Sequence, residues 1–142
     1  MDYGLTKSER LTSQLIIEKL FAGGNASMAA FPLRIVFMQV EKSEKNGSDE
    51  PPVSILVSVP KKRFRHAVDR NRMKRLVREA YRLNKHILWD ALEGKDVRLV
   101  LAFVCITDTL PTFYTVNKSM RKALARIAEK VEVNENLNPN KL

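Results

Sequence analysis

Hydrophobic residues follow two periods along this chain, and the two periods predict a mixture of strands and helices. Residues 53–59 alternate between Val or Ile on one side and Ser or Leu on the other, which is the two-residue period of a β-strand. The side with two serines can be open to solvent or to a ligand. Residues 31–40 are also rich in strand-forming side chains. Residues 97–106 are apolar at nearly every position, so we expect them to form a central strand buried on both faces.

Three other segments have apolar residues three or four positions apart, the spacing of amphipathic helices. A short helix is predicted within residues 11–24, capped at its start by Thr12 or Ser13. The Gly-Gly pair that follows ends it. A long helix should run from about Ala67 to the mid-80s. The last helix has one apolar stripe, made of Val116, Met120, Leu124, Ile127 and Val131.

The predicted order of elements is α-β-β-α-β-α, which defines the fold class as α+β. We expect a single-domain sandwich in which about three strands are covered by helices mainly on one side. Residues 1–131 are assigned to this domain. The polar segment 41–52, with one glycine and two prolines, should be a mobile hairpin connection. Residues 132–142 should form a disordered C-terminal tail.

The charge of the chain is concentrated in one segment. The chain has 25 Lys and Arg residues against 16 Asp and Glu, a formal net charge of +9. Residues 61–85 hold eleven of the basic residues and only two acids, Asp69 and Glu79, so this segment carries the whole excess. Such a segment favours an anionic partner: a nucleic acid, an acidic protein or a membrane surface.

The long helix in this segment has an apolar face and a basic face. At 100° per residue, the face that should be buried consists of Met73, Leu76, Val77, Ala80 and Tyr81. The face that should point outward consists of Asn71, Lys74, Arg75, Arg78, Arg82 and Lys85, flanked by Arg70 and Arg72. Several of these cations form like-charged pairs four residues apart, which destabilise a helix. Folding therefore does not explain this face, whereas a polyanionic partner does.

A nucleic acid explains the basic face better than a membrane does. A membrane-surface helix needs apolar residues free to insert, whereas the apolar face of this helix is needed for the core. Arg side chains bind phosphates through paired hydrogen bonds, and Asn71 can donate to and accept from a base edge or a sugar hydroxyl. The residues before the helix, among them Lys61, Lys62 and Arg65, add phosphate contacts at the helix start.

The stretch SVPKKRFRHAVDRNRMKRLVREAYRL, residues 58–83, resembles the signature of the bacterial ribonuclease P protein component. That signature is a strand ending in S-V-x-K-K, a basic turn, and then A-x-x-R-N-R-x-K-R-x-x-R-E. The specific part is Arg70-Asn71-Arg72 followed by Lys74-Arg75. A weaker likeness extends over about residues 5–131.

The resemblance implies a fold like the second domain of ribosomal protein S5, with a left-handed β-α-β crossover against the usual rule. It also implies the protein subunit of a ribozyme. In that family the RNA subunit hydrolyses precursor tRNA to free the mature 5′ end, with Mg²⁺ bound mainly by RNA and substrate. The implied partners are the catalytic RNA subunit and precursor tRNA, with no membrane and no obligate protein partner. We expect an endoribonuclease holoenzyme whose protein alone does not cleave.

The resemblance assigns residues to two RNA-binding roles. The surface for the catalytic RNA is expected to consist of Lys61, Lys62, Arg65, Arg70, Asn71, Arg72, Lys74, Arg75 and Arg78. The single-stranded 5′ leader of the substrate is expected in a cleft between the first helix and the sheet, formed by Ile17, Phe21, Arg34 and Ser58. The family often has aromatic residues where this chain has Ile17 and Arg34. We therefore expect leader binding that is more electrostatic and more sensitive to salt.

The sequence itself shows no catalytic or metal-binding motif. There is no Cys/His ligand set and no Gly-rich phosphate loop, and the acids are scattered. His66 and His86 should be surface residues, and Cys105 should be a packed thiol within a strand, which fits a reducing cytoplasm. We find no secretory signal and no stretch long enough to span a bilayer, so the expected location is cytoplasmic.

Three other functions stay open on the residues alone. Another RNA-binding protein, such as a ribosomal protein or an RNA chaperone, fits the charge and the fold class but not the R-N-R-x-K-R signature. A standalone nuclease needs converging carboxylates. A DNA-binding protein that reads the major groove needs more variety of base-reading side chains than this helix offers. Phe21 also has an alternative role, as a core side chain.

Overall fold

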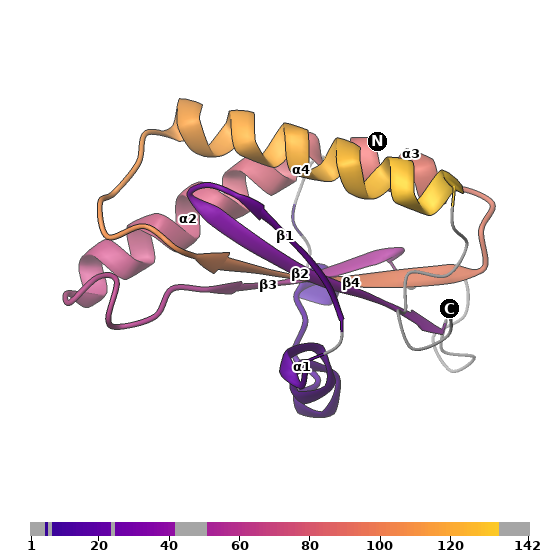
Figure 1. Ribbon diagram of the computed structural model, residues 1–142, viewed down its shortest axis with the longest axis horizontal. Helices are drawn as coiled ribbons and strands as arrows, with labels where there is room; N and C mark the ends of the chain where they lie inside the picture. The colour runs from indigo at the N-terminus through magenta and orange to yellow at the C-terminus, as the bar shows by residue number, and fades with distance from the viewer. Residues whose placement is uncertain (1–4, 6, 24, 42–50, 134–142) are drawn as a thin grey trace.

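The computed structural model describes residues 5, 7–23, 25–41 and 51–133, and it contains one mixed sheet with helices on both faces (Figure 1). The elements in chain order are the 3₁₀ helix η1 (Lys7–Glu9), α1 (Gln14–Phe21), β1 (Ala26–Ala30), β2 (Leu33–Glu41), β3 (Val53–Ser58), α2 (Ala67–Asn84), α3 (His86–Leu92), β4 (Val97–Cys105) and α4 (Phe113–Val133). The α+β fold class is confirmed, with a sheet of four strands instead of about three.

The strands lie in the order β1-β2-β4-β3. β2 pairs antiparallel with β1 and with β4, whereas β3 pairs parallel with β4. β4 therefore has a strand on each side, as its apolar sequence predicts. Along the outer edge of β3, Arg10 bridges to Ile55, and the Leu11 amide donates to the Ile55 carbonyl at 2.7 Å. The N-terminal segment thus covers this edge before it enters α1.

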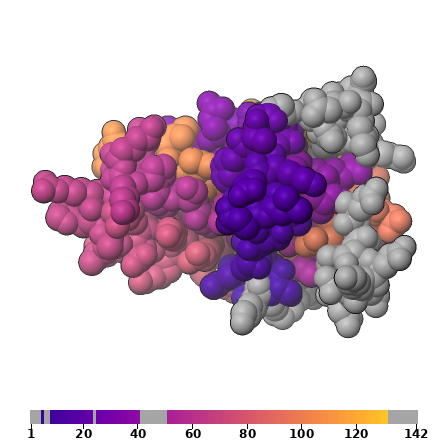
Figure 2. Space-filling model, turned by 90° about the horizontal axis from the view of Figure 1, so that it is seen from below, coloured from indigo at the N-terminus to yellow at the C-terminus, as the bar shows by residue number. Residues whose placement is uncertain are grey.

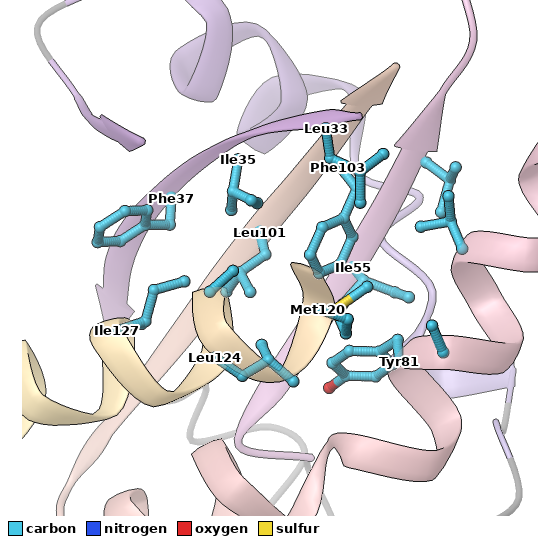
Figure 3. Close-up of a cluster of buried hydrophobic side chains, with 14 of the residues drawn as sticks. Leu33, Ile35, Phe37, Ile55, Tyr81, Leu101, Phe103, Met120, Leu124 and Ile127 are labelled. Atoms are coloured by element: carbon cyan, nitrogen blue, oxygen red, sulfur yellow. The ribbon is translucent and has the colours of Figure 1, made fainter. Parts of the chain in front are cut away.

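Each face of the sheet has its own hydrophobic core. Helices α2, α3 and α4 cover one face, where Phe103 of β4 and Tyr81 of α2 have ring centroids 5.9 Å apart (Figure 3). The single helix α1 covers the other face, where Leu20 clusters with Met38 and Val100. The prediction that helices lie mainly on one face is confirmed, and α1 is the exception.

The ends of the first two helices agree with the sequence pattern. Ser13 caps α1, because its hydroxyl oxygen accepts a hydrogen bond from the Ile16 amide at 3.4 Å. α1 ends at Phe21, and Gly23 follows with φ of 95°, a left-handed conformation that favours glycine. α2 spans the predicted range, from Ala67 into the mid-80s.

The sequence pattern does not predict β1 or α3. β1 has the sequence ASMAA, whose small side chains have low strand propensity and no clear alternation, and it forms against the edge that β2 presents. The basic helix stops at Asn84, and α3 begins as a separate helix at His86. Residues 42–50 and 134–142, which include most of the predicted mobile connection and tail, lie outside the described residues.

Lys85 was predicted on the outward face of the basic helix, and that prediction is wrong. Its side chain is 2% exposed, and its Nζ lies 2.8 Å from Glu9 Oε1 of η1 and 4.6 Å from the centre of the Trp89 ring. Trp89 in turn donates from Nε1 to the Tyr81 hydroxyl at 3.0 Å. The Lys85 backbone is still helical, with φ of −59° and ψ of −26°, but the N-terminal segment that carries Glu9 covers this side of the helix end, which a helical projection does not show. A carboxylate 76 positions away compensates the buried ammonium.

Cys105 is buried at the end of β4, as predicted. Burial is the largest cause that raises the pKa of its thiol, so the side chain stays protonated near neutral pH. Of the two histidines predicted at the surface, His66 is exposed and His86 is partly buried. None of the helices in the described part of the chain is long and apolar enough to span a membrane.

Candidate nucleic-acid interface

The basic turn between β3 and α2 is a fixed structure that presents cations. Lys61, Lys62 and Arg65 are exposed on it, whereas Phe64 is 7% exposed and belongs to the core. Arg70, in the first part of α2, holds the turn: its Nη1 donates to the Phe64 and Arg65 carbonyls, both at 2.9 Å. Arg70 therefore shapes the turn from which its predicted RNA-binding neighbours reach outward.

We expect Arg70→Ala to lower the free energy of unfolding by about 1–3 kcal/mol, because two carbonyl groups of the turn lose a charged donor. Arg72→Ala is the matched control, since Arg72 is exposed and forms no hydrogen bond to the described residues through its side chain. It should change stability by less than about 0.5 kcal/mol. Urea unfolding of both variants measures the difference, and equal stability would show that the Arg70 hydrogen bonds do not stabilise the turn.

Helix α2 presents the signature residues on its solvent-facing side. Asn71, Arg72 and Arg75 are exposed, and Lys74 and Arg78 are partly exposed. The structure therefore brings all the residues predicted to bind the catalytic RNA onto the turn and one side of this helix. The other side is buried as predicted; it consists of Met73, Val77, Ala80 and Tyr81, with Leu76 partly buried.

Arg78 has a neighbour that the sequence does not suggest, Arg10. Partial burial lowers the pKa of the Arg78 guanidinium, and the positive charge of Arg10 lowers it further. Arg10 belongs to the N-terminal segment beside β3, far from the basic segment in sequence, so the charge pattern along the chain gives no sign of it. An anion bound near both groups would relieve their repulsion, which favours a phosphate at this position.

Arg82 contributes less to the cationic surface than the helical projection predicts. Its Nε donates to Glu79 Oε2 at 3.1 Å, and its Nη2 donates to Oε1 of the same carboxylate. The hydrogen bond with Arg82 is the largest cause that lowers the pKa of Glu79. The two side chains compensate each other, so the excess positive charge of α2 is concentrated between Arg70 and Arg78.

A second surface lies on the other face of the sheet, beside α1. Figure 2 looks onto this face, with α1 in indigo near the centre and the magenta-to-pink segment of the turn and α2 beside it. Ser58 of β3 lies opposite Val104 of β4, which lies opposite Arg34 of β2. In each of the three strands, the residue two positions away belongs to the core under α1. Because side chains two positions apart in a strand point to the same face, these three side chains also lie on the α1 face. Ser58 and Arg34 are therefore about 10 Å apart, with Val104 between them.

Helix α1 brings Ile17 and Phe21 to the same face. Phe21 is 46% exposed, so it is not a core side chain, and Ile17 is partly buried against the core under α1. The serine-bearing side of β3 is open only at Ser58, because Ser54 is 2% exposed and Leu56 packs under α1. The accessible part of this face is therefore the end that carries the row of Arg34, Val104 and Ser58.

Exposed apolar side chains that the sequence pattern did not single out lie at this end of the sheet. Phe31, just before β2, is 65% exposed. Leu110, in the loop after β4, and Tyr114, in the first turn of α4, are 37% and 70% exposed. The Phe-Pro and Leu-Pro pairs mark both connections in the sequence, but only the fold shows that these side chains remain accessible.

The two surfaces offer groups for binding. Guanidinium and ammonium groups bind phosphates, the exposed Phe21 ring can stack on a base, and Asn71 and Ser58 can form hydrogen bonds. Within the ranges that the structure describes, no three His, Cys, Asp or Glu side chains gather to hold a metal ion.

Comparison with known proteins identifies the family. A family model described as Ribonuclease P matches residues 5–128. The ribonuclease P protein component of Porphyromonas gingivalis is 48% identical over 131 residues, which cover 91% of this chain and 90% of that protein. The ribonuclease P protein component of Chlorobaculum tepidum is 34% identical over 129 residues, which cover 87% and 82%.

A solved structure has the same fold. The Staphylococcus aureus RNase P protein is 18% identical and aligns with a TM-score of 0.59, over 87% of this chain and 97% of that chain. The match to the family model spans the turn, α2 and the α1 face of the sheet, and similar relatives cover most of the length. The chain therefore belongs to the ribonuclease P protein family, the protein subunits of the endoribonuclease that processes the 5′ end of tRNA.

Proposed function

We propose that the chain acts within ribonuclease P by binding two RNAs on two adjoining surfaces. The basic turn and α2 bind the catalytic RNA subunit, and the α1 face of the sheet binds the single-stranded 5′ leader of precursor tRNA. The observation that carries this proposal is the end of β3, where Ser58 of the leader surface is followed almost directly by Lys61 of the cationic surface. A leader held at Ser58 therefore approaches RNA that is bound at the turn.

The leader surface combines stacking, charge and hydrogen bonding. The exposed Phe21 ring can stack on one base, an interaction worth about 1–3 kcal/mol. Arg34 is exposed on β2 and can bind a backbone phosphate, and the Ser58 hydroxyl can bond to a sugar or phosphate oxygen. Ile17 adds an apolar contact at the edge of α1. Because single strands expose their base faces and duplexes do not, this combination favours a leader over a duplex.

Catalysis in this proposal belongs to the RNA subunit, and we expect the protein alone not to cleave. The described part of the chain offers no cluster of carboxylates to a metal ion. We place Mg²⁺ mainly on phosphate oxygens of the RNA subunit and the substrate, which are ligands that this cation prefers. The protein's Arg and Lys side chains neutralise further phosphates, which reduces the repulsion between the two RNAs.

The remaining features of the proposal follow from the family. We expect the connection from β3 through α2 and α3 to β4 to be a left-handed crossover, in a fold like the second domain of ribosomal protein S5. We assign the domain to residues 1–131 and the tail to residues 132–142. We place the complex in the cytoplasm, and we expect no membrane and no obligate protein partner.

A processing assay at low Mg²⁺ tests the function. Precursor tRNA is incubated with the cognate RNA subunit, with and without the full-length protein, and the protein should permit cleavage at the mature 5′ end where the RNA alone is slow. Cleavage by the protein alone would instead support a standalone nuclease. RNA binding without any effect on 5′ processing would support another RNA-binding protein, such as a ribosomal protein or an RNA chaperone.

Arg34→Ala should weaken leader binding and reduce its dependence on salt. One lost contact to a single-stranded phosphate lowers the slope of log affinity against log salt by about 0.7. The measurement is the affinity of the reconstituted holoenzyme for precursor tRNA, and for tRNA without a leader, at several salt concentrations. Arg121→Ala is the control with the same change of charge, because Arg121 is exposed on α4. An unchanged slope for Arg34→Ala would remove this residue from the leader surface.

A further inference from the structure

A groove lies between α2 and the loop that leads into α4, beside the surface proposed for the catalytic RNA. Its volume is about 460 Å³, within the range of about 300–1,000 Å³ that small-ligand sites occupy. Arg72 and Arg75 of α2 line one wall. Leu110, Pro111 and Phe113 line the other. Leu76 of α2 lies with the two arginines, so one wall carries both cations and the other is wholly apolar.

The apolar wall has a side-chain contact on each side of it in the sequence. Before Leu110, Asp108 forms an ion pair with Arg63 of the basic turn at 3.3 Å. After it, the Thr112 hydroxyl oxygen accepts a hydrogen bond from the Thr115 amide at 3.2 Å in the first turn of α4. Leu110 remains 37% exposed between these two contacts.

The Arg72 and Arg75 guanidinium groups of the cationic wall can donate hydrogen bonds to a ligand. Among the residues that the structure describes, the Arg72 and Arg75 side chains form no ion pair or hydrogen bond. Glu79 also lines the groove, but Arg82 binds its carboxylate. The groove therefore presents two guanidinium groups opposite a patch of apolar side chains.

We propose that this groove binds one unpaired nucleotide of the catalytic RNA. The base lies against Leu110, Pro111 and Phe113, and its flanking phosphates bind Arg72 and Arg75. A nucleotide has both properties that the walls require, a flat apolar face and adjoining anions. A base inside a duplex is stacked on both sides, so the bound nucleotide has to be unpaired. The inference rests on the proposed function and adds base recognition to a surface otherwise suited to phosphates.

The first test compares Leu110→Ser with Leu83→Ser, using the full chain and the cognate RNA subunit. The two leucines are 37% and 38% exposed, and Leu83 lies farther along α2, outside the groove. Leu110→Ser should weaken RNA binding by about 5- to 10-fold, the lower end of the range for loss of one stacked base. The salt slope should not change, because no charge is lost. Leu83→Ser should bind like the wild type.

The second test identifies the nucleotide by chemical probing. Wild-type protein should protect one unpaired base of the RNA subunit from base-modifying reagents, Leu83→Ser should do the same, and Leu110→Ser should restore its reactivity. A further variant, Leu110→Cys, can carry a tethered radical-generating group, because the natural Cys105 is buried. Strand cleavage should centre on the same nucleotide. If circular dichroism shows that Leu110→Ser does not fold, the tethered variant decides.

Three results would overturn the inference, and they differ in what they say of the proposed function. Equal affinity and equal protection for Leu110→Ser and the wild type would remove the groove as a nucleotide site, while a reduced salt slope for Arg72→Ala would keep the proposed function. Impaired processing with protection of the RNA subunit unchanged would assign the groove to the precursor tRNA, the other RNA in the assay. Failure of the wild-type protein to bind the RNA subunit would refute the proposed function itself.

Discussion

Lys85→Met is expected to lower the free energy of unfolding by about 3–5 kcal/mol, the cost of removing one partner of a buried ion pair. The Lys85 and Glu9 side chains are each 2% exposed, and the variant leaves the Glu9 carboxylate facing an apolar side chain instead of an ammonium. Met retains much of the length and volume of the Lys stem. Urea unfolding followed by Trp89 fluorescence measures the change, because this ring is the only tryptophan of the chain and lies 4.6 Å from Lys85 Nζ.

Two further variants separate the buried charge from other causes. Glu9→Gln combined with Lys85→Met should recover much of the lost stability, because a buried ion pair contributes little net free energy when both charges are replaced. Arg82→Met removes one partner of the more exposed pair with Glu79 and should leave the unfolding midpoint nearly unchanged. If Lys85→Met proved as stable as Arg82→Met, main-chain contacts with β3 would be enough to anchor the N-terminal segment.

Replacing Arg72, Lys74 and Arg75 together with Gln should weaken binding to the RNA subunit by about 10²–10³-fold at 0.1 M salt. Each cation that neutralises a phosphate contributes about one unit to the slope of log affinity against log salt, so Arg72 or Lys74 replaced alone should lower the slope by about one unit. The triple variant should lower it by about two to three units. The measurement is equilibrium binding of the RNA subunit over a range of salt concentrations.

The matched control places the same loss of charge on another helix. Lys118, Arg121 and Lys122 are exposed on α4, and replacing all three with Gln changes the net charge as much as the α2 variant does. This control should reduce the slope far less, because its cations lie outside the proposed interface. Equal loss of slope in the two triple variants would mean that net charge, and not the α2 surface, determines RNA binding.

Much of α2 could be predicted from the sequence because it depends on local spacing. Apolar residues three and four positions apart define its buried side, and this period is independent of what the helix packs against. Lys85 shows where such reasoning stops. The projection takes no account of other segments, whereas the partner of Lys85, Glu9, comes from 76 positions earlier in the chain and covers this part of the helix. No local pattern encodes that contact.

The proposed leader surface rests on the family resemblance and not on a local sequence pattern. Arg34 and Ser58 share one row because β2 and β3 both pair with β4, and the register of those pairings is a long-range property. The apolar wall of the groove was missed for a similar reason. In the sequence, Leu110 and Pro111 have the pattern of an ordinary loop. They form part of a groove because Arg72 and Arg75 lie opposite them in the folded chain.

The position of β4 between β2 and β3 also determines when each surface can form during synthesis. β4 is the last strand to leave the ribosome, yet it joins the strands that carry Arg34 and Ser58. Until Val104 has been added, no strand pairs with both β2 and β3 to bring these two side chains onto one surface. Strand pairing over such distances in sequence is also slow. The basic turn and the residues of α2 are synthesised earlier. In a growing chain, the residues proposed to bind the catalytic RNA are therefore complete before the proposed site for the substrate can form.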